Sequence, residues 1–390
     1  MKDKVVENLI KKEQKRQRSV INLIASENFV SKDVLAAVGS EFMNKYAEGY
    51  PGKRYYQGNS VVDELEVLCQ DRALKLFNLS PKSWQVNVQP LSGSPANLAV
   101  YAGLVPPGGK IMGLSLDQGG HLSHGQKVSL TGKWWQSVLY GVDQKTEQLN
   151  YREIKKIALK ENPNIIVAGF TSYPKIIDFR KFRSIADSVG ALLMVDMSHF
   201  AGLAAGKAYP SPFPYADVVT TTTHKTLRGP RGAMIFTKND KRNLPILINK
   251  AVFPQLQGGP HLNQIAGVAV ALKEANSPEF RKYARQVVKN AKALSDTLQD
   301  LGWRIASGGT DTHLLLVDTW MSGRGLSGGE AAVKLEKAGI IVNKNAIPYD
   351  TRKPFDPSGI RLGSPAETSR GKKEKDFIKI ARKIDKILKS

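Results

Sequence analysis

The middle of the chain alternates short apolar runs with amphipathic runs, and this alternation restricts the fold more than any other feature. Residues 165–170 are a continuous apolar run, and residues 178–189 place their apolar side chains on one helical face that ends at Gly190. Further apolar runs cover 191–195 and 216–223. Apolar strands separated by a helix predict an α/β fold with a mainly parallel central sheet, covered on both faces. Such sheets bind ligands at the carboxyl ends of their strands.

The pattern changes after about residue 270. Ser277 and Pro278 predict the cap and first turn of a long helix that stops at Gly302, and Ser327 with Glu330 forms a capping-box pattern that opens another helix. These elements predict a smaller C-terminal α/β domain beside the large one. We therefore expect three parts: an N-terminal arm over 1–35, a large domain over 36–270 and a small domain over 271–390.

Composition places the chain among ordinary globular proteins, since 41% of its 390 residues are hydrophobic. It contains one cysteine, Cys69, which fits a reducing compartment. We see no apolar run near the roughly 18 residues that span a bilayer, and the charged N-terminus does not look like a secretory signal. A cytoplasmic protein with no membrane partner is expected.

The net charge of +22 is unusual and raises the possibility that the protein binds nucleic acid. The sequence shows no arginine-rich tract, no basic run with interleaved aromatic residues and no zinc-finger spacing, and we expect no metal site. A solvated, lysine-rich surface accounts for the charge more simply. Nucleic acid is therefore not the expected partner, although the charge leaves that class open.

A polar segment follows the apolar run that ends near residue 223. Four threonines at 220–223 precede His224 and Lys225, and a glycine-rich turn with Arg231 comes next. A lysine at a strand end is ordinarily a surface lysine reaching for water. Here neighbouring cations and partial desolvation would lower its pKa, as a Schiff-base lysine requires.

A carboxylate ends the preceding apolar run. Asp196 follows residues 192–195, and His199 comes three residues later. A carboxylate at the tip of an apolar strand is costly to bury without a partner. Asp196 could simply cap the next turn, or it could keep the pyridine nitrogen of pyridoxal phosphate protonated. Because the two strands are consecutive, Asp196 and Lys225 could face one pocket.

An anion site is predicted upstream. Ser92, Gly93 and Ser94 form a turn, and Pro95 is expected at the first position of an apolar helix. The free amides of a helix start, together with two hydroxyls, can bind a phosphate. Many helices begin with Ser-Pro, so the motif gains its weight from the aspartate and lysine downstream.

Three further loops are more polar than a fold alone requires. Residues 46–56 hold four tyrosines and Glu48, residues 119–125 offer an imidazole that could stack on a flat ring, and residues 358–361 offer the guanidinium of Arg361 for a carboxylate. Taken singly, each could be a surface loop with satisfied polar groups.

Together these motifs resemble the serine hydroxymethyltransferase family, whose members have an aspartate-aminotransferase-like large domain. The resemblance runs from residue 22 to residue 366. Its most specific stretches are residues 44–56, the threonine run with His224 and Lys225, and residues 251–260.

The resemblance implies a role for each matching residue. Lys225 would hold pyridoxal phosphate as a Schiff base, Asp196 would face the pyridine nitrogen, and His121 would stack on the ring. Thr171 and His199 would contact the phenolic oxygen, with Thr222 and His224 tuning reaction specificity beside the lysine. Phosphate would be held by Ser92, Gly93 and Ser94, and the substrate carboxylate by Arg361 and Ser26. Glu48 would exchange a proton with the serine hydroxyl.

The family pattern also implies a homodimer with shared active sites. Residues that would reach in from the neighbouring subunit are Tyr46, Glu48, Tyr55, Tyr56 and Gly259. Tyr46 and Gly259 would contact the cofactor. Glu48, Tyr55 and Tyr56 would contact the substrate, and Tyr56 is also a catalytic candidate. Residues matching the folate region are Leu116, Gly120, His121, Leu122, Phe253, Asn345, Lys353, Pro354 and Phe355. Tyr349 and Gln255 depart from the family pattern near that region.

The implied reaction is reversible transfer of the serine hydroxymethyl carbon to tetrahydrofolate, giving glycine and 5,10-methylenetetrahydrofolate. A folate-independent aldolase acting on threonine or other 3-hydroxy amino acids is the alternative, because it would share the lysine, the aspartate and the phosphate site. The tyrosine loop and the folate-side residues argue against the aldolase.

Overall fold

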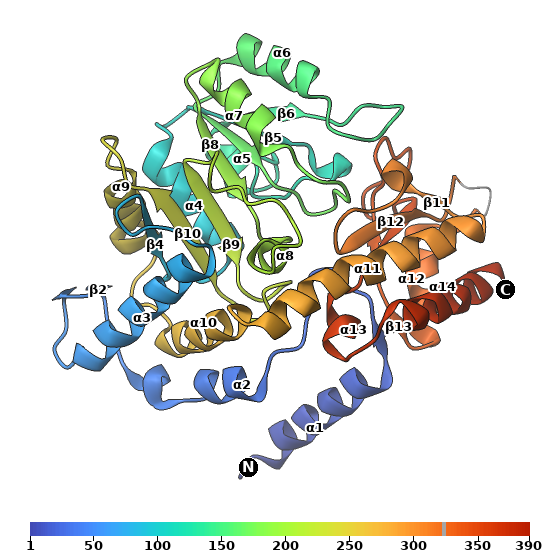
Figure 1. Ribbon diagram of the computed structural model, residues 1–390, viewed down its shortest axis with the longest axis horizontal. Helices are drawn as coiled ribbons and strands as arrows, with labels where there is room; N and C mark the ends of the chain where they lie inside the picture. Colours follow the sequence, from blue (N-terminus) through green and yellow to red (C-terminus); the bar gives the residue numbers. More distant parts are fainter. Residues whose placement is uncertain (322–324) are drawn as a thin grey trace.

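The computed structural model describes residues 1–321 and 325–390, and a seven-stranded sheet runs through its larger part (Figure 1). The strands of this sheet are β4 (Trp84–Asn87), β5 (Lys110–Leu114), β6 (Gln136–Tyr140), β7 (Ile165–Ala168), β8 (Leu192–Asp196), β9 (Val218–Thr222) and β10 (Ala233–Lys238). Their order is β4-β10-β9-β8-β7-β5-β6. Neighbours from β9 to β6 are parallel, whereas β10 is antiparallel to both β9 and β4. The predicted mainly parallel sheet is confirmed.

Helices cover both faces of this sheet. The helices of the larger part are α2 (Lys32–Val38), α3 (Ser60–Leu76), α4 (Gly93–Leu104), α5 (Leu130–Trp134), α6 (Tyr151–Glu161), α7 (Phe179–Asp187), α8 (Ala201–Ala205), α9 (Leu244–Lys250) and α10 (Leu262–Ala275). In β7, Ile165 and Val167 pack in one apolar core with α4, while Ile166 and Ala168 pack in another with α7. This two-sided burial explains why the strands are continuously apolar.

A second sheet forms the smaller part of the molecule. Its strands, in the order β11-β12-β15-β14, are β11 (Arg304–Ile305), β12 (Leu314–Asp318), β15 (Gly359–Gly363) and β14 (Asn343–Asn345), and all pairs are antiparallel. Its helices are α12 (Gly328–Lys337), α13 (Pro365–Ser369) and α14 (Glu374–Lys389). Ser327 and Glu330 form the predicted capping box of α12.

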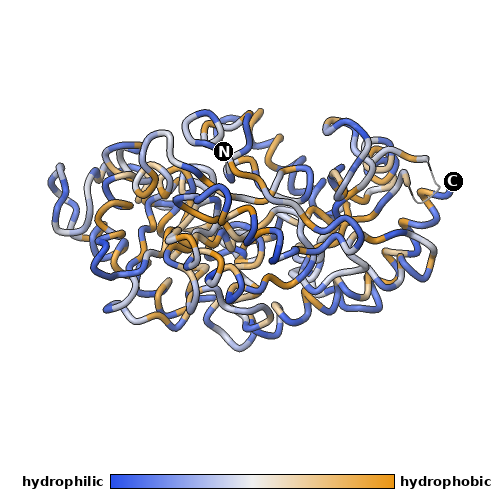
Figure 2. The backbone as a smooth tube through the Cα atoms, turned by 90° about the horizontal axis from the view of Figure 1, so that it is seen from above, coloured by the Kyte–Doolittle hydropathy of each residue, from blue (hydrophilic) through white to orange (hydrophobic). Residues whose placement is uncertain are grey.

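One long helix joins the two parts, as Figure 1 shows. α11 (Pro278–Asp300) is capped by Ser277, as predicted. Its N-terminal half places Phe280 and Val287 in the core of the larger part, and its C-terminal half places Leu294 in the core of the smaller part. In Figure 2 the apolar residues lie mainly inside the molecule and the hydrophilic ones on its outside. The division at residues 35 and 270 stays our proposal.

The N-terminal segment connects the two parts a second time. After α1 (Lys4–Ser19), which buries no residue, β1 (Ile21–Asn22) pairs in parallel with β13 (Ile340–Ile341). The amide of Gly363 donates to the carbonyl of Leu23, and the side-chain amide of Asn28 donates to the carbonyl of Lys225 (2.9 Å). Residues 24–27 therefore cross between the parts. Within the described ranges, no helix is long and apolar enough to cross a membrane.

Candidate active site

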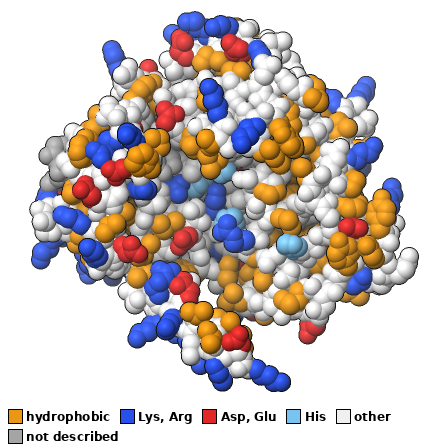
Figure 3. Space-filling model, turned by 180° about the vertical axis from the view of Figure 1, so that it is seen from behind, with side chains coloured by type: hydrophobic (Ala, Val, Ile, Leu, Met, Phe, Trp, Pro, Cys, Tyr) orange, Lys and Arg blue, Asp and Glu red, His pale blue; other side chains and the backbone are white. Residues whose placement is uncertain are grey.

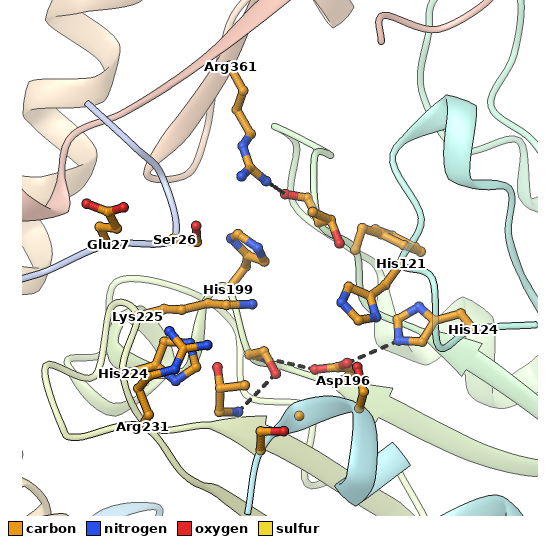
Figure 4. Close-up of a pocket in the computed structure, with 17 residues that line it drawn as sticks. Ser26, Glu27, His121, His124, Asp196, His199, His224, Lys225, Arg231 and Arg361 are labelled. Atoms are coloured by element: carbon orange, nitrogen blue, oxygen red, sulfur yellow. Dashed lines mark hydrogen bonds and ion pairs between the residues drawn. The ribbon is translucent and has the colours of Figure 1, made fainter. Parts of the chain in front are cut away.

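A cavity of about 360 Å³ opens at the carboxyl ends of β4, β5, β7, β8 and β9. Figure 3 shows the hollow, where lysine, arginine and histidine side chains gather, and Figure 4 shows its residues. The cavity is lined by Ser26, Glu27, Ser92, Gly93, Ser94, His121, His124, Phe170, Thr171, Asp196, Ser198, His199, Thr222, His224, Lys225, Arg231 and Arg361. Twelve of the residues predicted from the sequence are brought together here.

Asp196 ends β8 and is held by three donors. Oδ2 accepts hydrogen bonds from Asn97 (2.9 Å) and lies 3.0 Å from Nε2 of His124, while Oδ1 accepts from the amide of Ser198 (3.0 Å). Burial opposes the charge of this carboxylate, but the hydrogen bond to His124 and the charges of nearby groups outweigh it and hold the pKa of Asp196 well below its ordinary value. Asp196 is therefore an anion at the floor of the cavity.

Lys225 lies three residues beyond the end of β9 and lines the same cavity as Asp196 (Figure 4). Its pKa is lowered to about 8, mainly by burial, with smaller contributions from the charges of Arg361 and Arg231, whereas Asp196 opposes the shift. A larger share of the amine is neutral near physiological pH than for an ordinary lysine, so Lys225 can act as a nucleophile.

The start of α4, where the sequence predicts an anion site, lies in the wall of the cavity. The Ser92 side chain makes no capping hydrogen bond to the helix, and Ser92 and Ser94 both line the cavity. A Cβ at Gly93 would lie 2.8 Å from Cγ2 of Thr222, so any side chain there would have to displace Thr222 or the helix start. The expectation that Pro95 is the first helical residue is wrong: α4 begins at Gly93 and Pro95 is third. The first turn still tolerates it, since amides there lack intrahelical partners.

Three imidazoles line the cavity in their neutral form. Burial lowers the pKa of His121 to about 4 and that of His224 to about 3. Burial and the charges of Lys225 and Arg361 lower the pKa of His199 well below its ordinary value. Neutral rings suit stacking on an aromatic ligand and donation of a hydrogen bond without added charge.

The far wall of the cavity carries Arg361. Its Nη1 donates to the carbonyl of Thr171 (2.8 Å) and its Nε to Oδ1 of Asn343 (3.1 Å). Figure 4 shows the guanidinium and the hydroxyl of Ser26 approaching the cavity from the same side, opposite Asp196. A carboxylate of a small ligand would meet both groups there.

Predicted residues of the tyrosine loop do not line this cavity. Tyr46 donates to Oε1 of Glu48 (3.1 Å) and contacts the ring of Tyr56, with 5.0 Å between ring centres. Gly259 packs under the ring of Tyr46, since a Cβ there would lie 3.3 Å from Cε2. Tyr46, Tyr55 and Tyr56 are 52%, 72% and 47% exposed. We call these residues, with Glu48 and Gly259, the tyrosine cluster.

Residues of the predicted folate region fall into three groups. The carbonyl of Gly119 accepts the amides of Thr171 and Ser172, and Ser172 donates to Oδ1 of Asn345 (3.1 Å), which ties the loop of Leu116, Gly120 and Leu122 to the cavity rim and to Asn345. Phe355 is exposed, with Lys353 above its ring. Phe253 lies elsewhere, 5.6 Å from Tyr55 between ring centres, in contact with the tyrosine cluster.

Sequence reasoning missed several groups that shape the cavity. His124, Asn97 and the amide of Ser198 donate to Asp196, and the hydroxyl of Ser198 accepts the amide of Thr222 (2.9 Å). His124 and Asn97 lie close in sequence to His121 and Ser92, in two segments that the sequence analysis already placed near strand ends. That closeness was the signal that could have identified them as cavity residues.

The donors present fit pyridoxal phosphate. The hydroxyl of Thr222 is buried in the cavity with no hydrogen-bond partner among the described residues, and Ser92 and Ser94 offer free hydroxyls at a helix start. An anion at Asp196, an amine at Lys225 and an anion site at α4 match the ring nitrogen, aldehyde and phosphate of that cofactor.

Comparisons with known proteins agree with this chemistry. A family model described as serine hydroxymethyltransferase matches residues 1–384. Proteins named serine hydroxymethyltransferase from Desulfotalea psychrophila and Rickettsia prowazekii are each 52% identical over 386 residues, covering 99% of this chain and 88% and 90% of the relatives. One from Koribacter versatilis is 53% identical over 375 residues, covering 96% of this chain and 86% of the relative.

Proposed function

The chain belongs to the serine hydroxymethyltransferase family, and we propose that it transfers the hydroxymethyl carbon of serine reversibly to tetrahydrofolate, giving glycine and 5,10-methylenetetrahydrofolate. The enzyme is a transferase. The observation that carries the proposal is the buried anion Asp196 beside Lys225, whose pKa is lowered, in one cavity with Arg361. Family membership favours this reaction over folate-independent cleavage of 3-hydroxy amino acids.

Pyridoxal phosphate would be held by Lys225 through its amine, by Asp196 at the ring nitrogen, by His121 on the ring face, and by Ser92, Gly93 and Ser94 at the phosphate. When bound, it supplies an electron sink for the bond between Cα and Cβ of serine. His224 and Thr222 lie beside the lysine in the lining of the cavity, and Thr171 and His199 would contact the phenolic oxygen of the ring. Tetrahydrofolate would accept the one-carbon unit.

The substrate carboxylate would be gripped by Arg361 and Ser26, which fixes the orientation of the amino acid. Glu48 would move a proton at the serine hydroxyl oxygen. Because Glu48 lies in the exposed tyrosine cluster and not in the cavity of its own chain, a neighbouring copy must supply it. We therefore propose a homodimer with shared sites, in which Tyr46, Tyr55, Tyr56 and Gly259 accompany Glu48.

Folate would bind at the rim formed by Leu116, Gly120, Leu122, Asn345 and the loop from Lys353 to Phe355. Contact between Phe253 and Tyr55 supports placing Phe253 with the groups that the neighbouring copy supplies. We propose a cytoplasmic location, on the evidence of the single buried cysteine.

Serine cleavage measured with and without tetrahydrofolate tests the proposal. We expect strong stimulation by folate in the parent, and loss of both the activity and the visible absorbance of the bound cofactor in Lys225→Ala. Equal cleavage of serine with and without folate would contradict the proposal and favour the alternative function, a folate-independent aldolase. Lys250→Ala, a lysine outside the cavity, is the control.

A further inference from the structure

A second buried histidine lies directly behind His199. His313 precedes β12 in the smaller part of the molecule and is only 1% exposed. Its Nε2 lies 3.2 Å from Nδ1 of His199, and the two rings stack with 5.4 Å between centres at an angle of 23°. His199 lines the cavity, as Figure 4 shows, whereas His313 does not. His313 therefore acts on the cavity only through His199.

Both rings are neutral at physiological pH. The pKa of His313 is lowered to about 3, mainly by burial, with the charges of Arg361 and Lys225 adding to the shift. The pKa of His199 is lowered well below its ordinary value for the same reasons. A neutral imidazole carries one N–H and one bare nitrogen. At 3.2 Å, one of the facing nitrogens must donate and the other must accept.

The surroundings of His313 select the direction of this hydrogen bond. Its Nδ1 is buried and has no hydrogen-bond partner in the described part of the chain. If His199 were the donor, His313 would carry its proton on that Nδ1 and bury an unpaired N–H, which proteins rarely do. If His313 is the donor, only a bare nitrogen stays without a partner.

We propose that His313 is a positioning residue that donates from Nε2 to Nδ1 of His199 and so fixes His199 as an Nε2–H donor toward the cavity. The oxygen that receives this hydrogen bond belongs to the bound cofactor, so the inference rests on the proposed function. His313 thereby sets both the tautomer and the ring orientation of His199, and does so from the smaller part of the molecule.

Two substitutions distinguish a hydrogen-bond donor role of His313 from a role in packing alone. His313→Gln keeps an amide N–H near the place of Nε2, whereas His313→Leu fills similar space and donates nothing. If His313 served only to pack, both variants would behave alike.

Nitrogen-15 NMR of the full chain, labelled at histidine and measured without added cofactor, tests the tautomer directly. We expect His199 to carry its proton on Nε2 in the parent and in His313→Gln, and to populate both tautomers in His313→Leu. A parent spectrum with the proton on Nδ1 of His199 would overturn the proposal, as would identical His199 signals in the two variants. If the leucine variant does not fold, the parent and the glutamine variant still decide.

Titration with pyridoxal phosphate gives a second readout. Loss of one neutral hydrogen bond predicts about three- to tenfold weaker binding to His313→Leu, and binding within about twofold of the parent for His313→Gln. Equal weakening in both would overturn the donor role. Failure of the parent protein to bind the cofactor would instead contradict the proposed function. The NMR result on the tautomer of His199 would still test the role of His313.

Discussion

The imidazole of His124 and the carboxylate of Asp196 lie 3.0 Å apart, and both are buried. The two residues are 72 positions apart in the sequence, on the loop after β5 and at the end of β8. His124 is one of three donors to Asp196, beside Asn97 and the amide of Ser198, and its hydrogen bond helps to keep this buried carboxylate charged.

Replacing His124 tests this relationship. His124→Leu removes a hydrogen bond to a buried carboxylate, and we expect the free energy of unfolding to fall by about 1.5–3 kcal/mol and cofactor binding to weaken about tenfold. Chemical denaturation and titration with pyridoxal phosphate measure the two effects. His124→Gln retains a donor and should lose less than half as much; equal losses would mean that only packing matters.

Lys225 should react with a pH profile shifted toward neutrality. Its pKa is about 8, so the neutral amine predominates above that pH and the ammonium form below it. The rate of cofactor capture by the ligand-free protein, followed by stopped-flow absorbance, should therefore rise with pH and reach half its maximum near 8, instead of near 10.5 as for an ordinary lysine.

Burial is the main cause of that shift, and Arg231→Gln checks one of the smaller causes. Loss of this cation should move the midpoint to higher pH, because its charge disfavours the ammonium form of Lys225. Lys241→Gln, which removes a cation outside the cavity, should leave the midpoint unchanged. A midpoint that moves equally in both variants would point to net charge and not to the local contact.

The shared site can be tested by mixing two inactive variants. Glu48→Gln and Lys225→Ala should each lose most folate-dependent activity, because each lacks one group of the same site. After unfolding and refolding together in equal amounts, about half of the dimers are hybrids with one intact site of two, so about a quarter of parental activity should return. Activity no greater than that of the separate variants would place Glu48 in the site of its own chain.

Gly93 should tolerate no side chain. In Gly93→Ala the new Cβ would lie 2.8 Å from Cγ2 of Thr222 at the start of α4. We expect at least about tenfold weaker binding of pyridoxal phosphate, because displacement of this turn moves the amides that are proposed to hold the phosphate. Gly39→Ala, where the added Cβ has ordinary contacts, is the matched control for fluorescence titration. Unchanged affinity in Gly93→Ala would place the phosphate elsewhere.

The sequence predicted the sheet and the residues at its strand ends because both depend on local patterns. Asp196 follows an apolar strand, and Lys225 follows the next one, so a parallel sheet brings them to one edge whatever the rest of the chain does. The long helix α11 was equally predictable, since its cap and apolar stripe are local.

Contacts between distant segments were beyond such patterns. His313 meets His199 across 114 positions because the smaller part of the molecule docks on the larger, and no periodicity encodes that docking. The tyrosine loop is equally instructive: its composition suggested a site, but only the fold shows that Tyr46 and Glu48 lie outside the cavity of their own chain.

The segment that carries Ser26 has a mechanical consequence. Leu23 is fastened to Gly363, two residues from Arg361, and Asn28 is fastened to the carbonyl of Lys225. Five peptide units cannot extend beyond about 17 Å, so this segment is a short tether between the group proposed to bind the substrate carboxylate and the group proposed to hold the cofactor. However the two parts of the molecule move during turnover, the tether limits how far Arg361 can withdraw from Lys225.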